Sequence, residues 1–141
     1  MASRKEGEVW LKFSLMAMAL WGLWGVLSKV ATRHLPPQGV YLLTITGHLV
    51  VMTYVLSQGF PITWHPVGVA AALSAGLCMA FGLLTFFFAL ARGEAAVVVP
   101  VTALYPVVTV ILSLALLQES FTLRRAAGVV LAVVAVWLLS K

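Results

Sequence analysis

The chain has 141 residues, of which 62% are hydrophobic and only 9% are charged, and its mean hydropathy is +1.07. This composition excludes an ordinary soluble domain and indicates an integral membrane protein. The formal net charge of +5 comes from residues clustered near expected helix ends, so it indicates anchors at the membrane surface and no nucleic-acid partner.

Five apolar segments are predicted to cross the membrane as α-helices. Proline and glycine interrupt helices, so we expect the helices to end at Pro36-Pro37, at Gln58-Gly59 and at the turn over residues 91–94. The first segment is too long for the core of a signal peptide and is read as a retained span. Short connections predict one compact all-α domain over residues 1–141, with helices at about 9–31, 39–57, 67–91, 95–117 and 122–139.

The fourth segment carries no charge between Glu94 and Glu119 and contains two prolines, Pro100 and Pro106. Proline removes a backbone donor, and membrane helices tolerate it where neighbours or water satisfy the carbonyl that loses its partner. We therefore expect helix kinks at both prolines beside a polar cavity.

Polar side chains recur at helical spacing on the first four segments and form candidate cavity stripes. The alternative is that each hydroxyl bonds to its own helix or to a neighbouring helix and only stabilises packing. The candidate substrate-cavity residues are Trp21, Ser28, Thr44, His48, Thr85, Thr102, Tyr105 and Thr109.

His48 is the candidate for proton coupling, because it is the ionisable side chain near the middle of a span. A neutral histidine that hydrogen-bonds across a helix interface is the alternative. Lys29, about one turn from the end of the first helix, is expected to extend to the lipid headgroups. Gly128 and Ala132 on the fifth helix form a small-xxx-small pair, which predicts either a dimer contact or packing within the protomer.

Positive charges are divided almost equally between the two sides of a five-span chain. One side would hold five, in the N-terminal tail and before the fifth helix, and the other would hold four. The positive-inside rule then gives almost no orientation, which predicts insertion in both directions. The alternative is that the first helix dominates and places the N-terminus inside.

Several short motifs occur together in a characteristic order. They are Trp21-Gly22 with Lys29, the run from Ala89 to Ala95, Pro100 with Pro106, Leu117-Gln118-Glu119 with Thr122, and Gly128. This pattern resembles the EamA domain of the drug/metabolite transporter superfamily, in its single-repeat, five-helix bacterial and archaeal branch. The resemblance implies a multi-pass protein of the cytoplasmic membrane that pairs as an antiparallel, inverted homodimer of dual topology.

The resemblance further implies a secondary transporter that moves a small organic metabolite by alternating access between two protomers, surrounded by membrane lipid. A subunit of a flippase for lipid-linked carriers and a non-transporting membrane adaptor are the alternatives. Four-helix multidrug relatives use a glutamate in helix 1, which residues 9–31 lack. We expect no enzyme, cofactor or metal, because the chain has no aspartate, no histidine pair on one helix turn and no Gly-x-Ser-x-Gly elbow.

Overall fold

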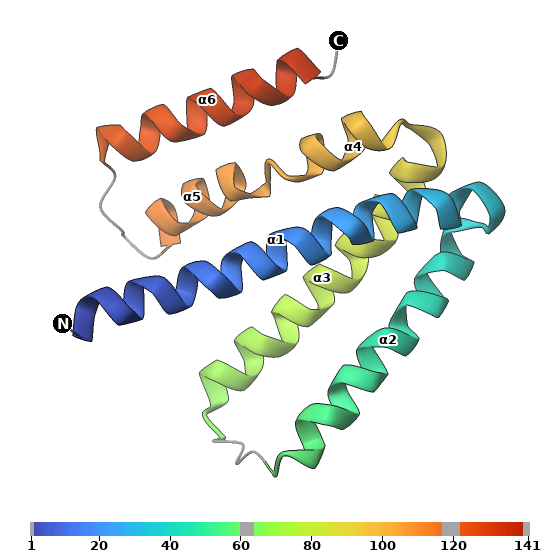
Figure 1. Cartoon of the computed structure of the whole chain (residues 1–141), viewed down its shortest axis with the longest axis horizontal. Helices are drawn as coiled ribbons and strands as arrows, with labels where there is room; N and C mark the ends of the chain where they lie inside the picture. Colours follow the sequence, from blue (N-terminus) through green and yellow to red (C-terminus); the bar gives the residue numbers. More distant parts are fainter. Residues whose placement is uncertain (1, 60–63, 117–121, 140–141) are drawn as a thin grey trace. The chain divides into compact units, whose positions relative to one another are not determined.

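The computed structural model describes residues 2–59, 64–116 and 122–139, with the backbone alone for residues 2–8 and 125. Every regular element in these ranges is an α-helix, which confirms the all-α class (Figure 1). The helices are α1 (Ala2–His34), α2 (Pro37–Ser57), α3 (Pro66–Arg92), α4 (Ala95–Thr102), α5 (Tyr105–Leu116) and α6 (Leu123–Leu139).

Four helical stretches within the described residues are long and apolar enough to cross a membrane. They are Val9–His34, Pro37–Ser57, Pro66–Arg92 and Ala95–Leu116. The last helix, α6, has 17 residues and is therefore roughly 25 Å long, somewhat less than the hydrocarbon thickness of about 30 Å. The structure thus supports four spans and a shorter apolar helix where the sequence predicts five spans.

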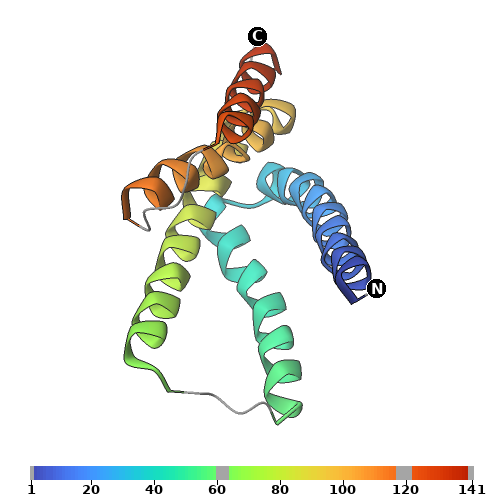
Figure 2. The ribbon, with the colours of Figure 1, turned by 90° about the vertical axis from the view of Figure 1, so that its left-hand side faces the viewer.

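The chain divides into two compact units, Met1–Ala91 and Arg92–Lys141, each of which is described by itself. In the first unit, α1 and α2 are in contact. The C-terminal part of α1, the start of α2 and the end of α3 converge, whereas the opposite ends of α2 and α3 separate (Figure 2). We call the converging region the closed end. A single domain over residues 1–141 stays a prediction.

An aromatic cluster packs the closed end of the first unit. The rings of Trp24 on α1 and Phe86 on α3 are stacked, with centroids 4.9 Å apart and planes inclined by 20°. Phe87 lies 6.1 Å from Trp24 and has no exposed surface. Such aromatic pairs stabilise the folded state by about 0.5–1.5 kcal/mol in addition to the energy gained from burying their surface. The buried residues that define the closed end are Gly25, Ser28, Val40, Leu83, Phe86, Phe87 and Leu90.

The ends of α2 and α3 follow from local chemistry. Pro37 is the first residue of α2, where its missing N–H costs nothing. The helix ends before Gly59, whose φ of 62° is a left-handed conformation that glycine adopts without strain. At the start of α3, the His65 ring accepts a hydrogen bond from the Gly68 N–H at 3.3 Å and so caps the helix.

The second unit contains the largest departure from the sequence prediction. The sequence predicts one kinked helix over residues 95–117, but α4 ends at Thr102 and α5 begins at Tyr105. Pro106 cannot donate to the Thr102 carbonyl, and its ring crowds that oxygen, so the helix is interrupted at this turn. Pro100 is accommodated inside α4. The helix is therefore completely interrupted before Pro106, where the sequence predicts only a kink. The predicted end of this helix, residue 117, lies outside the described residues.

The last helix, α6, packs against α4 in the second unit. Thr122 precedes α6, and its carbonyl accepts the first hydrogen bond of the helix from Ala126 at 3.0 Å. A Cβ atom built on Gly128 would meet nothing within 4 Å, and Ala132 is exposed. Within the described residues of the second unit, Gly128 and Ala132 therefore lie on an open surface of α6.

Truncating Phe87 to alanine tests the closed end. We expect Phe87→Ala to lower the free energy of unfolding by about 3 kcal/mol, because a buried ring leaves a cavity and loses its dispersion contacts. Phe81→Ala is the matched control on the same helix, because Phe81 is 68% exposed. Thermal unfolding in detergent, followed by circular dichroism, measures both variants. Equal losses would contradict a closed end held by Phe87.

Candidate functional site

The predicted cavity residues fall into two groups, one in each unit. Trp21, Ser28, Thr44, His48 and Thr85 belong to the first unit, and Thr102, Tyr105 and Thr109 belong to the second. A cavity lined by both groups stays a prediction.

The two candidates on α1 differ in exposure. Ser28 is 5% exposed, so in this structure it belongs to the closed end of the first unit. Trp21, two turns earlier on the same side of α1, is 63% exposed. The predicted stripe of α1 thus begins on an open surface and ends in the buried core.

The threonine hydroxyls bond to their own helices, as the packing alternative proposes. A hydroxyl has one donor hydrogen and two acceptor lone pairs, so each side chain that donates to its helix presents an acceptor outward. Each of the following threonine bonds stays within one helix or the turn of the same span. The bonds run from Thr44 to the Val40 carbonyl (2.8 Å), from Thr85 to those of Phe81 (3.0 Å) and Gly82 (2.9 Å), from Thr102 to those of Val98 (2.8 Å) and Val99 (2.9 Å), and from Thr109 to that of Tyr105 (3.2 Å).

His48 is exposed near the centre of α2. Its Nδ1 lies 3.1 Å from the Thr44 carbonyl oxygen, one turn earlier on the same helix. A carbonyl only accepts, so this bond places the ring hydrogen on Nδ1 and leaves Nε2 of a neutral ring as an acceptor. His48 is the twelfth of the 21 residues of α2, which places it near mid-membrane.

Lys29 is expected to extend to the lipid headgroups, but in the structure its side chain contacts another helix. Its ammonium Nζ donates to the Leu90 carbonyl near the end of α3, at 2.6 Å. Carbonyls in the last turn of a helix lack helical donors. A cation placed there is also attracted to the negative end of the helix dipole. Lys29 therefore joins α1 to α3 at the closed end, beside the aromatic cluster.

Sequence reasoning missed this connection, together with the pairing of Trp24 and Phe86. The available signal was modest: a lysine and a tryptophan near the end of one span, and a Phe-Phe-Phe run near the end of another. Their contact joins residues about 60 positions apart, and helical periodicity carries no information about such distant pairs.

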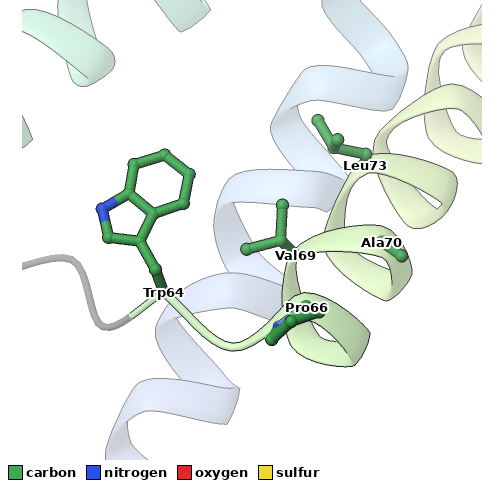
Figure 3. Close-up of a pocket in the computed structure, with 5 residues that line it drawn as sticks. All are labelled: Trp64, Pro66, Val69, Ala70 and Leu73. Carbon is green, nitrogen blue, oxygen red and sulfur yellow. The ribbon is translucent and has the colours of Figure 1, made fainter.

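A shallow apolar hollow lies at the other end of α3 (Figure 3). The Trp64 ring stands away from the helix, opposite Val69 and Leu73, with Pro66 below them. The lining residues are Trp64, Pro66, Val69, Ala70 and Leu73. None of the predicted cavity residues lines this hollow.

Comparison with known proteins identifies the family. A model described as the EamA-like transporter family matches residues 8–141, nearly the entire chain. The chain belongs to the EamA-like transporter family. An uncharacterized protein of Methanocaldococcus jannaschii is 29% identical over 127 residues, which cover 89% of this chain and 92% of that protein. No solved structure matches the chain significantly.

Membership of the EamA-like family, together with the apolar helices, makes the chain a multi-pass membrane protein of the drug/metabolite transporter superfamily. Members of the family are transporters, which fits the expectation that this chain is not an enzyme. Among the described residues, no group of three or more His, Cys, Asp or Glu side chains is placed to hold a metal ion.

Replacing Lys29 tests the tie between α1 and α3 in this EamA-like chain. We expect Lys29→Met to lower the free energy of unfolding by about 2 kcal/mol, because hydrogen bonds made by charged groups contribute about 1.5–3 kcal/mol. Methionine keeps the length of the side chain and removes the charge. Lys12→Met, at an exposed position of α1, should change stability by less than about 0.5 kcal/mol.

Unfolding of both variants in detergent, followed by circular dichroism, checks the expectation. Equal stability of the Lys29→Met variant and the parent protein would mean that the lysine contributes nothing to the closed end.

Proposed function

We propose that this protein is a secondary transporter that moves a small organic metabolite across the cytoplasmic membrane of a bacterium or archaeon. Transport proceeds by alternating access in a cavity between two copies inserted in opposite orientations. The observation that carries the proposal is the match to a transporter family over residues 8–141.

The distribution of charge supports the inverted pairing independently of the family. Five Lys or Arg residues against four give no strong orientation, whereas a protein with one fixed topology usually has a clear excess on one side. Inverted repeats are a common design of secondary transporters, with the substrate held near mid-membrane. A chain with one repeat obtains this arrangement by pairing with a second copy.

The candidate cavity residues have different roles in this proposal. Thr44, Thr85, Thr102 and Thr109 present acceptor oxygens to substrate, because their hydrogens are bonded to their own helices. The exposed aromatic side chains of Trp21 and Tyr105 supply stacking surface and a hydrogen-bonding group each.

The moving parts and the dimer contact complete the proposal. The break before Pro106 lets α4 and α5 change their mutual angle, and Pro100 weakens α4 in the same span. Ser28, buried in this structure, becomes accessible when the closed end opens. Gly128 and Ala132, which lie on an open surface of α6 within the described part of the second unit, form part of the contact between copies.

Labelling of single cysteines tests the inverted pairing. Ser3→Cys and Ser140→Cys are introduced separately in a Cys78→Ala background, and intact cells are treated with an impermeant thiol reagent. We expect each site to be labelled from outside in about half of the molecules, because the charge balance orients neither direction. Labelling of one site in every molecule and of the other in none would exclude the inverted pair.

Substitutions in the candidate cavity test transport itself. Amino acids, sugars, nucleosides and amines are first screened for thermal stabilisation of the purified protein, and the strongest radiolabelled hit is followed into proteoliposomes. We expect Tyr105→Ala, Thr102→Val and His48→Ala to reduce its uptake at least about tenfold with folding retained, the loss expected from about 1.4 kcal/mol of transition-state binding.

Thr53→Val is the control, because Thr53 lies about 140° around α2 from His48 and bonds to the Leu49 carbonyl of its own helix. Uptake unaffected by any cavity variant would contradict these roles. Movement only of lipid-linked headgroups would favour the flippase alternative, and no response to any substrate would favour the adaptor.

A further inference from the structure

The start of α3 is capped by a histidine ring. Pro66, the first residue of α3, has no N–H, and the Val69 N–H bonds to the backbone carbonyl of His65 at 2.8 Å. The Gly68 N–H donates to Nδ1 of the His65 ring at 3.3 Å. The ring therefore takes one of the backbone donors that the first turn of a helix leaves without an intrahelical partner.

This cap distinguishes α3 from two other helices of the chain. Pro36 precedes α2 and Glu94 precedes α4, and neither makes a side-chain capping bond. The usual capping residues are asparagine, aspartate, serine and threonine, whose oxygen atoms accept hydrogen bonds throughout the range from about pH 5 to 8. A histidine ring accepts a hydrogen bond only while it is neutral, so this cap depends on a protonation state.

The capping bond fixes the state of the His65 ring. A backbone N–H can only donate, so Nδ1 carries a lone pair and the hydrogen of the neutral ring lies on Nε2. An imidazolium ring donates through both nitrogens and accepts at neither. Protonation of His65 therefore removes the acceptor of the Gly68 N–H. It also places a positive charge at the positive end of the α3 dipole, where cations are unfavourable.

His65 lies at a membrane surface whichever way the chain is inserted. One candidate span ends at Ser57 and the next begins at Pro66, so residue 65 belongs to the connection between two spans. Histidine is the side chain that ordinarily changes its charge between about pH 5 and 8. The His65 ring therefore meets the pH of the compartment on its side of the membrane.

The other ionisable groups of the first unit do not share this response. The sequence between Arg33 and Arg92 contains no Lys, Arg, Asp or Glu, so no fixed charge of α2, and none near the start of α3, faces the ring. Lys12 on α1 and Tyr54 on α2 lie toward the same membrane surface as His65. Lysine and tyrosine ordinarily change charge near pH 10, well above the histidine range.

We propose that His65 is a pH-sensitive cap, which loosens the first turn of α3 when the compartment on its side of the membrane becomes acidic. At neutral pH the ring accepts the Gly68 N–H and the helix begins at Pro66. At acidic pH the Gly68 N–H turns to water and the first turn frays. Where two copies are inserted in opposite directions, as proposed above, their His65 caps face opposite compartments, and a pH difference loosens α3 in one copy alone.

The capped turn also builds the apolar hollow beside Trp64 (Figure 3). Pro66 lies in this turn, Val69 follows directly, and Val69 stands opposite the Trp64 ring. Tryptophan at the end of a span serves as an anchor at the membrane surface. Fraying of the turn separates the Trp64 ring from Pro66 and Val69, so acidic pH changes how this end of α3 is held in the membrane.

Exchange of the Gly68 amide hydrogen with water tests the cap. Protein labelled with ¹⁵N-glycine is studied by NMR in detergent micelles, and the Gly68 signal is assigned by its absence from Gly68→Ala. The added Cβ of that variant would lie 3.7 Å from the His65 Cβ, an ordinary contact. Rates are divided by the intrinsic rate at each pH. We expect the relative rate to rise at least about fivefold from about pH 7.5 to about pH 5, as a helix loses its cap.

Two variants make the result specific to the ring. His65→Asn keeps a capping oxygen at both pH values and should keep Gly68 protected at both, whereas His65→Ala should exchange fast at both. Gly82, farther along α3, is the control signal and should stay slow.

Three results would overturn the pH-sensitive cap. They are equal relative rates at the two pH values in the parent protein, the same rise in His65→Asn, and a rise at Gly82 as large as at Gly68, which would show general unfolding. None of these results depends on the orientation of the chain, so the inverted pair keeps its own test by labelling at residues 3 and 140.

Discussion

The structure depends on one constraint: in hydrocarbon, every backbone N–H and C=O must find its partner within the protein. Continuous helices meet this requirement within each segment, and the threonine hydroxyls that bond to their own carbonyls add no demand for an outside partner. Pro100 inside α4 leaves the Ala96 carbonyl without its helical donor, and two further places in the described chain depart from this pattern. Pro106 leaves the Thr102 carbonyl without its helical donor, and His48 carries an acceptor to mid-membrane. Both coincide with stretches that the sequence marks as candidates for substrate or proton movement.

Packing within the first unit is concentrated at its closed end. There the stacked Trp24 and Phe86 rings and the Lys29 ammonium on the Leu90 carbonyl fix α1 against α3. Away from this region the large apolar side chains are exposed, as on α2, where Val50 is 71% exposed. The first unit therefore gains its internal packing energy at one end. The surface left over is available to lipid, to the rest of the chain or to another copy.

The sequence predicts the class of fold well, because length, apolar content and breakers are local properties. Gly59 ends α2 and Pro66 begins α3 for reasons visible in a few residues. Local sequence rules are less reliable where a continued helix and an interrupted helix differ little in free energy. Pro100 and Pro106 carry the same signal, yet α4 continues through one and ends before the other. Distant pairs are not predicted at all: nothing in the pattern distinguishes Trp24, which packs, from Trp21, which is exposed.

The Lys29 tie has a consequence for energetics when two copies are inserted in opposite directions. Each membrane face then carries one closed end, and both closed ends are built from the same residues. The inward-open and outward-open states are then related by a two-fold rotation and have equal intrinsic free energy, so gradients across the membrane alone decide which state is occupied. A single codon change at Lys29 alters both sides of the membrane together, and evolution of such a chain cannot adjust one gate without the other.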